Sequence, residues 1–585
     1  MIAMNTYHFF LLLYVFFGLV VSCSNNSVGE VLQEPLTKPN IDGIRIDWDY
    51  STMVKIAPAV GHNEVYCGYA RLEQIHDGNL ACVYETSSGN VELVFSYDSG
   101  KTWSTPQIVF RTENNISMAV PDIIELSDHS ILVACNPRPR KAYTDDRKFG
   151  IKVKRSVDGG KSWGDEKLIY EAQSTFNDGC WEPSFVQLPS GEVQLYFSNE
   201  GIYTSSDEQN ISIFRSMDSG KTWTKEPEIV GFRKNRRDGM PVPLVLQDKG
   251  EILVSVEDNK QGEFKPTIYH EKLSKNWADG VISGDDPRRD YQPLDELLPD
   301  EISAGAPFIV RLKSGEVLLS YQSTWNRSDS WDRACMVVEV GTDDGTRFRN
   351  RSVPFTVPIN KSGLWNSLLV INDGTVPVAL TSTNAYSTNS TEVWMIKGHV
   401  IPEFSVPVGT ISVDGQLTEG CWQGEWPYFI GQKSKTRMKA TVCADDHYLY
   451  LASKIDNLEQ VNGSAGGISC QVDIARKGYE KPHHGIFTFH FNLDRSLKIE
   501  EGDYGTWKEL DVPGSIQYKV RQKENSYVIE AAIPKAFFKN GLPQGNTVGI
   551  NFLLNYNLLP GHITEESISG NDKNAPYTWC PILMN

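Results

Sequence analysis

The sequence predicts an all-β protein in which a six-bladed β-propeller is followed by a β-sandwich. Three observations support this prediction: a short turn phrase recurs, six pairs of apolar runs follow one another, and the pattern changes beyond residue 404. A chain of 585 residues is also too long for one hydrophobic core, so at least two domains are expected.

The recurring phrase has the form Ser-x-Asp-x-Gly-x-x-Trp and occupies residues 96–103, 156–163 and 216–223, with a degenerate copy at residues 341–348. Its Ser and Asp can hydrogen-bond a turn backbone, and its Gly suits the left-handed position of a hairpin turn. The Trp then packs the turn onto its sheet. The first three copies start 60 residues apart, a period typical of propeller blades. The phrase therefore indicates architecture and not catalysis.

The blades themselves are indicated by an apolar run, a turn and a second apolar run, repeated six times. The six units are residues 69–85, 120–136, 182–198, 240–257, 306–322 and 364–381. Short strands separated by turn signals at regular intervals predict six blades. A further strand at residues 44–49 is expected to close the ring by joining the last blade.

In each unit, the first strand begins and the second strand ends at the same rim, opposite the hairpin turn. The second strands end on polar residues: Glu85, Asn136, Ser198, Glu257, Gln322 and Thr381. The first strands begin with Arg71, Asp122 and Glu182. A polar mouth rich in carboxylates predicts a substrate site at this rim, with the repeated turn phrases on the opposite one.

Two of these carboxylates have the more specific signal. Glu182 lies among Trp181, Pro183 and Phe185, and Glu257 follows the apolar run 252–256. A desolvated carboxylate suits acid/base or nucleophilic chemistry. The simpler interpretation is that strand ends are where polar residues commonly lie, and for Ser198, Gln322 and Thr381 it is at least as good.

The turn phrase resembles the Asp-box of sialidases and related six-bladed glycoside hydrolases. Residues 181–183, 196–200, 237–241, 256–257 and 305–307 resemble the exo-arabinanases of glycoside hydrolase family 93, over roughly residues 60–400. That resemblance implies a retaining mechanism with Glu182 and Glu257 as the nucleophile and the acid/base. It also implies that nearby side chains hold the sugar: Arg71, Glu85, Asp122, Asn136, Arg138, Trp181, Tyr196, Gln322 and Trp325.

Two alternatives to a secreted exo-acting, arabinan-cleaving glycosidase stay open. A resemblance to the exo-sialidases of this fold would imply a Tyr/Glu nucleophile pair, an Asp acid and three Arg that clamp the sugar carboxylate. Arg71 lies near the place of the sialidase Arg-Ile-Pro motif, but the motif itself is absent. A non-catalytic glycan-binding propeller would show the same aromatic richness without needing two buried Glu.

The predicted domains are a propeller at residues 43–404 and a sandwich at residues 405–585. Beyond residue 404, alternating strands separated by Gly, Asn and Asp turns indicate the sandwich. This part resembles domains of the carbohydrate-binding module family 9 type. Its candidate sugar-stacking residues are Trp422, Trp426, Tyr428 and Trp579, with core packing the favoured interpretation for Trp422.

The start of the chain predicts export. Residues 1–22 have the apolar run of a signal peptide, and Val20-Val21-Ser22-Cys23 resembles a bacterial lipobox. We therefore expect lipidation at Cys23, a polar tether over residues 23–42, and a membrane-anchored lipoprotein in the periplasm or at the cell surface. The anchor would be the protein's only membrane contact.

Composition narrows the partners. The net charge of −18 and the absence of a basic cluster argue against nucleic acid, which leaves a carbohydrate as the expected partner. The sequence has no Cys-x-x-Cys pair, no His-Glu-x-x-His and no EF-hand loop. Neither a metal nor a cofactor is therefore expected.

Overall fold

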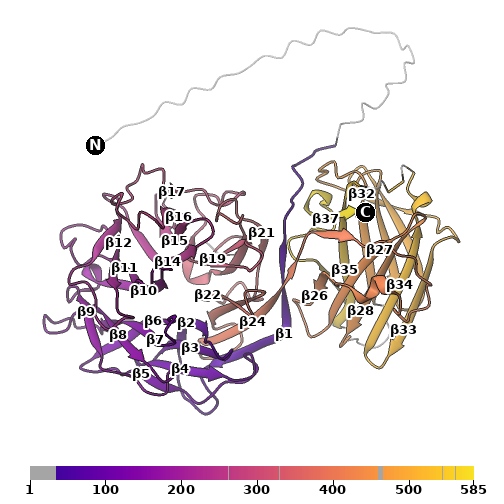
Figure 1. Ribbon diagram of the computed structural model, residues 1–585. Helices are drawn as coiled ribbons and strands as arrows, with labels where there is room; N and C mark the ends of the chain where they lie inside the picture. The colour runs from indigo at the N-terminus through magenta and orange to yellow at the C-terminus, as the bar shows by residue number, and fades with distance from the viewer. Residues whose placement is uncertain are drawn as a thin grey trace, which may run out of the picture.

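A computed structural model describes residues 35–585 except 261, 328–329, 459–465, 540, 543–544 and 560–561. The predicted signal peptide, the lipidation site Cys23 and residues 23–34 of the tether lie outside the described residues. Figure 1 shows two β domains side by side. Within the described residues, the helices are short 3-10 turns: η1 (Phe176–Asp178), η2 (Trp331–Arg333), η3 (Gly420–Gln423), η4 (Lys535–Phe537) and η5 (Pro576–Thr578). None of these is long and apolar enough to cross a bilayer.

The first domain is a propeller of six four-stranded antiparallel sheets. Blade 1 holds β2 (Cys67–Gln74), β3 (Leu80–Thr86), β4 (Val91–Ser96) and β5 (Gln107–Phe110), and blade 2 holds β6 (Ile116–Glu125), β7 (Ile131–Pro139), β8 (Gly150–Ser156) and β9 (Lys167–Glu171). Blade 3 holds β10 (Cys180–Gln187), β11 (Val193–Asn199), β12 (Asn210–Ser216) and β13 (Glu228–Gly231).

The other three blades repeat this order. Blade 4 holds β14 (Asp238–Leu246), β15 (Glu251–Asp258), β16 (Lys265–Lys272) and β17 (Arg289–Asp290), and blade 5 holds β18 (Ala304–Arg311), β19 (Val317–Ser323), β20 (Cys335–Val340) and β21 (Arg349–Ser352). Blade 6 holds β22 (Gly363–Ile371), β23 (Val376–Thr383), β24 (Glu392–Ile401) and, as its outermost strand, β1 (Arg45–Ala57).

The ring closes as the sequence predicted. Strand β1 pairs antiparallel with β24, with Arg45 opposite Ile401 and Asp49 opposite Lys397. Each innermost strand contacts the innermost strand of the next blade, and β22 of blade 6 contacts β2 of blade 1. The all-β prediction and the six-bladed architecture are therefore confirmed.

The repeated turn phrases are the turns between the third and fourth strands of their blades. In the first copy, Ser96 Oγ donates to Asp98 and accepts the Gly100 N–H at 2.7 Å, and Asp98 Oδ1 accepts the Thr102 N–H at 2.9 Å. The side of Gly100 faces Met395 of blade 6, so a Cβ there would lie 2.4 Å from the Met395 methyl. The phrase thus stabilises its own turn and packs it against the preceding blade.

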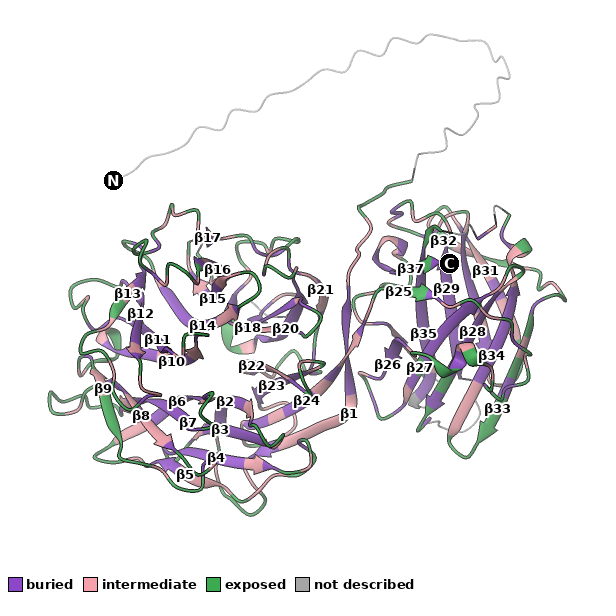
Figure 2. Ribbon diagram, viewed as in Figure 1, coloured by how far each residue is buried: buried purple, intermediate pink, exposed green. Residues whose placement is uncertain are grey.

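The propeller core lies between the blades. The second strand of each blade is buried along nearly its whole length, and β11 is buried at every residue (Figure 2). Both faces of such a strand are covered by neighbouring blades, so apolar residues follow one another without the polar alternation of a sheet with one solvent face.

The second domain is a sandwich of two sheets. One sheet has the order β25 (Phe404–Val406), β37 (Cys580–Met584), β35 (Thr547–Leu559), β29 (Gly467–Asp473), β30 (Ile486–Asn492), β31 (Leu497–Asp503) and β32 (Thr506–Leu510), with β36 (His562–Ser567) paired to β35. The other has the order β26 (Tyr428–Ile430), β27 (Arg437–Ala444), β28 (Tyr448–Asp456), β34 (Ser526–Pro534) and β33 (Gln517–Lys523). This confirms the predicted sandwich.

Three of its four candidate stacking residues are core residues. Tyr428 and Trp579 are fully buried, and Trp422 is buried with its indole N–H donated to Glu530 at 2.8 Å. Trp426 is partly buried beneath the Lys454 ammonium, 4.3 Å from its ring. The stacking hypothesis is therefore wrong for Tyr428 and Trp579, because their rings face the protein interior, and the core packing favoured for Trp422 is confirmed.

The two domains share contacts through the segment that leads into β1. The Lys38 N–H donates to the Gly478 carbonyl at 2.7 Å, and the buried Arg45 guanidinium donates to the Thr578 carbonyl at 3.0 Å. The Ser569 N–H in turn donates to Asp47 at 3.0 Å. Residues 35–47 therefore connect the propeller to the sandwich before β1 enters blade 6.

Candidate active site

Every blade carries a β-bulge near the start of its innermost strand. The pairing register shifts there in all six sheets. One residue in each bulge has a left-handed backbone with φ between 49° and 52°, and these six bulge residues are Tyr69, Val120, Glu182, Met240, Ala306 and Trp365. A left-handed backbone is rare for residues with a side chain, but its presence in all six blades makes it part of the architecture.

The bulge residues line the rim at which the innermost strands begin, which we call the site rim. Tyr69, Val120, Met240 and Ala306 are buried together near the axis, with Trp365 packed against them. The sixth bulge residue, Glu182 of blade 3, is the one that carries a charge. A carboxylate therefore enters an otherwise uncharged ring of side chains.

The polar residues at the ends of the second strands have a common structural role. In five blades, a side chain at this position accepts the backbone N–H of the next blade's bulge residue, a contact we call a clasp. The clasps are Glu85 to Val120 (2.8 Å), Ser198 to Met240 (3.0 Å), Glu257 to Ala306 (2.9 Å), Gln322 to Trp365 (3.0 Å) and Ser382 to Tyr69 (3.0 Å). In blade 6 the clasp is therefore Ser382, one residue beyond the predicted Thr381.

The site rim contains a cavity of roughly 400 Å³, within the range of small-molecule sites. Three carboxylates, two arginines and a set of aromatic rings surround it. Its lining residues are Tyr66, Tyr69, Glu85, Arg138, Phe176, Trp181, Glu182, Gln209, Arg237, Glu257, Trp331 and Trp365. Predicted site residues present in this lining are Glu85, Arg138, Trp181, Glu182 and Glu257.

Glu182 is held in an environment that opposes its ionisation. Its side chain is 18% exposed, and burial raises its pKa to about 7, with the like charge of Glu257 adding to the rise. The Arg138 guanidinium, 4.0 Å from Glu182 Oε1, and the Ser198 hydroxyl act in the opposite direction. The carboxyl can therefore change its protonation state near neutral pH.

Glu257 lies between two glycines at the bottom of the cavity. A Cβ on Gly239 would approach Glu257 Oε1 to 3.1 Å, and one on Gly305 would approach Oε2 to 2.7 Å. Glycine at both positions therefore leaves room for this carboxylate in its present place. Burial raises the pKa of Glu257, whereas the Ala306 clasp and the Arg237 charge lower it.

A fourth carboxylate, Glu200, lies behind the lining and supports the cavity wall. It accepts the Trp181 indole N–H at 2.8 Å and the Gln209 amide at 3.0 Å, and it forms an ion pair with Arg237. Glu200 is 3% exposed, and burial raises its pKa to about 7. Because its oxygens are engaged with wall residues, Glu200 positions them.

The rest of the lining includes a hydrogen-bonded pair, Tyr66 and Glu85, and a wall of aromatic rings. The Tyr66 hydroxyl donates to Glu85 Oε1 at 2.9 Å, and burial next to Glu85 raises the Tyr66 pKa well above its ordinary value. The aromatic wall consists of Tyr69, Trp365 and Trp331, with ring centroids 5.8 Å and 6.1 Å apart along the series. Trp331 is 53% exposed, so the wall reaches from the buried ring to the surface.

Four predicted contact residues lie outside the cavity lining. Arg71 is buried with its guanidinium against the rings of Tyr69 and Phe308, and Asp122 is buried and accepts the Phe185 N–H at 2.7 Å. Asn136 is fully buried and donates to the Gly150 carbonyl at 2.8 Å. Gln322 is the buried clasp of blade 5. All four side chains contact other parts of the protein. The prediction that they hold the sugar is therefore corrected: their contacts are structural.

The two other predicted stacking rings are also corrected. Tyr196 is fully buried between blades 3 and 4, where its hydroxyl donates to Gln194 and accepts the Trp277 indole N–H at 3.0 Å. Trp325 has the Arg351 guanidinium 3.8 Å from its ring centroid. One ring is therefore interior and the other has a face covered by a cation.

Seven lining residues were absent from the predicted set: Tyr66, Tyr69, Phe176, Gln209, Arg237, Trp331 and Trp365. For the bulge residues a signal was present, because Pro follows the bulge in four blades, at positions 121, 183, 241 and 307. Aligning the six units on that position would have identified Tyr69 and Trp365. The others lie in loops or 3-10 turns, as with Phe176 in η1 and Trp331 in η2.

Comparison with known proteins shows what the propeller is similar to. Residues 141–400 match the BNR repeat-like domain. A sialidase of Micromonospora viridifaciens is 29% identical over 133 residues, which cover 22% of this chain and only 18% of that sialidase. The match and the six blades with their turn phrases confirm the predicted resemblance.

Two solved structures illustrate the likeness of each domain. The GH93 alpha-L-arabinofuranosidase of Fusarium graminearum, in complex with arabinobiose, has 18% identity and a TM-score of 0.45, covering 61% of this chain and 97% of its own. A family 9 carbohydrate-binding module from Caldicellulosiruptor kristjanssonii, in complex with cellotriose, has 16% identity and a TM-score of 0.26, covering 31% and 93%. The N-terminal domain of this protein is a six-bladed propeller in which residues 141–400 match the BNR repeat-like domain.

Proposed function

We propose that this protein is an exo-acting, retaining glycoside hydrolase that removes terminal sugars from an arabinan-like glycan. The observation that carries the proposal is the presence of two partly buried carboxyls, Glu182 and Glu257, in one cavity lined by aromatic rings. A retaining glycosidase needs one carboxylate to attack the anomeric carbon and one carboxyl to protonate the leaving oxygen.

The surroundings of the two groups are alike: burial raises the pKa of both, and an arginine opposes the rise at each. Glu182 faces the Arg138 guanidinium, which favours the ionised form that a nucleophile needs. At Glu257 the Arg237 charge has the same effect, and the burial of both carboxyls allows either one to hold a proton near neutral pH. The order of the two residues in the family 93 resemblance assigns Glu182 as the nucleophile and Glu257 as the acid/base. The aromatic wall would stack on the sugar ring, as such surfaces commonly do.

Exo action is supported by the ring of bulge residues. Their apolar side chains pack together near the axis, which favours a cavity that accepts the end of a glycan over a groove that admits its middle. The glycosidases among the similar proteins support the same class of activity at a coarse level.

An exo-sialidase is the second candidate, and one observation favours it. The Tyr66 hydroxyl bonded to Glu85 supplies a Tyr/Glu pair at the cavity. Against it, a sialic carboxylate calls for three arginines, and the lining contains Arg138 and Arg237, each already paired with a carboxylate. Arg71 is buried under aromatic rings.

The test is a hydrolysis screen of the purified protein against arabinan oligosaccharides and sialyl-lactose, with released sugars identified and the anomeric configuration of the first product followed by NMR. Release of an arabinose-containing product that is lost in Glu182→Gln and kept in Tyr66→Phe supports the proposal. Release of sialic acid that is lost in Tyr66→Phe would establish the alternative. Binding without hydrolysis would leave a glycan-binding propeller.

Export and lipid anchoring at Cys23 are proposals that a membrane fractionation of the wild type and Cys23→Ala would test.

A further inference from the structure

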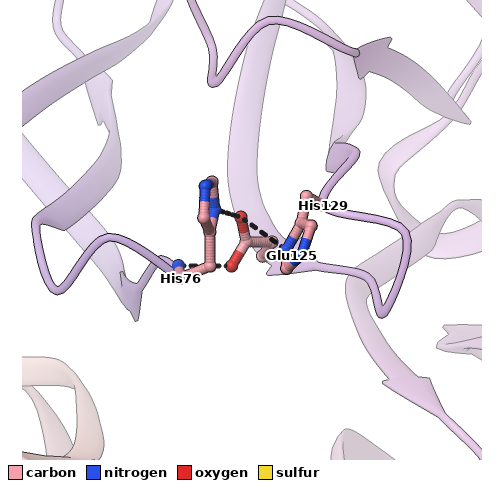
Figure 3. A group of neighbouring side chains, drawn as sticks. All are labelled: His76, Glu125 and His129. Atoms are coloured by element: carbon pink, nitrogen blue, oxygen red, sulfur yellow. Dashed lines mark hydrogen bonds and ion pairs between the residues drawn. The ribbon is translucent and has the colours of Figure 1, made fainter.

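A cluster of two histidines and a glutamate lies on the rim opposite the cavity, which we call the turn rim. His76 is in the hairpin turn between β2 and β3 of blade 1, Glu125 ends β6 of blade 2, and His129 is in the turn that follows it. Figure 3 shows the three side chains converging from the two blades. Their ligand atoms all lie within 4.8 Å of one another.

The cluster offers nitrogen and oxygen donors in an arrangement close to that of a metal site. Glu125 Oε1 is 2.5 Å from His76 Nδ1 and 3.9 Å from His129 Nδ1. The centroids of the two imidazole rings are 4.3 Å apart. In a tetrahedral zinc site the donors lie about 3.3 Å from one another. Because the side chains of His76 and His129 are 47% and 62% exposed, they can rotate to reach these distances.

The repeat itself shows that His129 departs from what the fold requires. The same turn position has a left-handed backbone in all six blades, and the other five carry glycine: Gly78, Gly191, Gly250, Gly315 and Gly374. His129 adopts φ of +62° there. A residue with a Cβ is strained in this conformation. Blade 2 therefore has a strained histidine where the other five blades have an unstrained glycine.

Glu125 departs from the repeat in a second, independent way. Residues at its position reach the turn of the preceding blade: Gln74 accepts the Asn372 N–H at 2.9 Å and Gln187 accepts the Ser127 N–H at 2.8 Å. Glu125 Oε2 makes the same contact with the His76 N–H at 2.6 Å. An amide oxygen is thus sufficient for this contact, and the carboxylate of Glu125 leaves Oε1 available to the two imidazoles.

We propose that His76 Nδ1, Glu125 Oε1 and His129 Nδ1 bind a zinc ion that cross-links the hairpin turns of blades 1 and 2. Two imidazoles and one carboxylate are a ligand set that zinc accepts, with water completing its coordination at the exposed side. On binding, the metal replaces the proton that His76 and Glu125 share in their hydrogen bond. The ion stabilises the folded state, since the separated turns of the unfolded chain offer no such set. The sequence motifs could not reveal this site because its ligands come from two blades.

The experiment is calorimetric titration of the full-length protein with zinc chloride after removal of metal with EDTA, together with melting temperatures with and without zinc. The wild type should bind one ion per chain and melt at a higher temperature when zinc is present. His129→Gly should lower the zinc affinity at least about tenfold and abolish the melting shift. Its fold should persist, because glycine is the residue that the other five blades have at this position.

Two further variants separate metal binding from folding. Glu125→Gln keeps an oxygen for the His76 N–H, as Gln74 and Gln187 show, and should still weaken zinc binding at least about tenfold. His447→Ala, at an exposed histidine of the sandwich, should bind zinc as the wild type does. Equal affinity in wild type, His129→Gly and Glu125→Gln, or no stoichiometric binding by the wild type, would overturn the proposal.

Discussion

The two rims of the propeller are built from the same sixfold repeat, and each departs from it in a different blade. At the site rim, five bulge residues are uncharged and blade 3 has Glu182. At the turn rim, five turns have glycine and blade 2 has His129. Because all six blades satisfy the same backbone geometry, five of them show what folding alone requires at each position. The residue that differs is then a candidate for function.

The comparison of blades also shows that Glu257 and Glu182 occupy different positions of the repeat. Glu257 occupies a clasp position, where Glu85 and Gln322 make the equivalent contact in blades 1 and 5. One oxygen of Glu257 therefore has a structural partner, and only the other is free for chemistry. Glu182 occupies a bulge position where the fold does not require a polar side chain.

The largest expected effect is that of Glu182→Gln. Removal of a nucleophile should lower kcat by a factor on the order of 10³ or more, because the covalent step is lost. The melting temperature at pH 4 should match that of the wild type. Val120→Ile, at the corresponding bulge of blade 2, serves as the matched control and should retain most activity. Full activity of Glu182→Gln would remove the distinction between blade 3 and the other blades.

Glu257 sharpens the comparison because two substitutions should behave differently. Glu257→Gln should lose activity by a similar factor, yet keep the clasp, since Gln322 shows that an amide oxygen accepts the bulge N–H. Glu257→Ala should lose activity and also about 1–3 kcal/mol of unfolding free energy, because the Ala306 N–H loses its acceptor. Activity assays combined with urea unfolding distinguish the two. Equal stability of both variants would contradict the clasp.

The sequence was sufficient to predict the six hairpins, the closing strand β1 and the pair Glu182 and Glu257, because each leaves a local pattern of apolar runs and turn residues. It failed for Tyr196 because both faces of an inner strand are covered by neighbouring blades, so periodicity does not show which side a ring faces. For Arg71 and Asp122, the bulge adds a residue before them and changes which face they occupy. Trp331 comes from a 3-10 turn whose place no repeat predicts.

The pH dependence of stability tests the environment of Glu182 without any substrate. A carboxyl that titrates near pH 7 when folded and near 4.5 when unfolded contributes its stability below pH 4.5 and loses it as the pH rises through 7. The wild type should therefore become less stable than Glu182→Gln at pH 9, by on the order of 3 kcal/mol, and equal to it at pH 4.

Urea unfolding at pH 4, 7 and 9 measures this difference. Glu226→Gln, at an exposed position between β12 and β13 of the same blade, should follow the wild type at every pH. A wild type and Glu182→Gln with parallel pH profiles would show that Glu182 is not desolvated by its blade.

The smallest effect is expected at the outer end of the aromatic wall. Trp331 is 53% exposed and contacts Trp365 at a centroid distance of 6.1 Å, so Trp331→Ala should change the unfolding free energy by no more than about 0.5 kcal/mol. If the wall stacks on the sugar, the same substitution should raise KM by roughly fivefold with little change in kcat, because an exposed ring contributes about 1 kcal/mol of uniform binding. Trp325→Ala, at a ring outside the cavity, is the matched control and should leave KM unchanged. A fall in kcat at constant KM would instead place Trp331 in contact with the reacting sugar, and the wall would then belong to the same functional unit as Glu182.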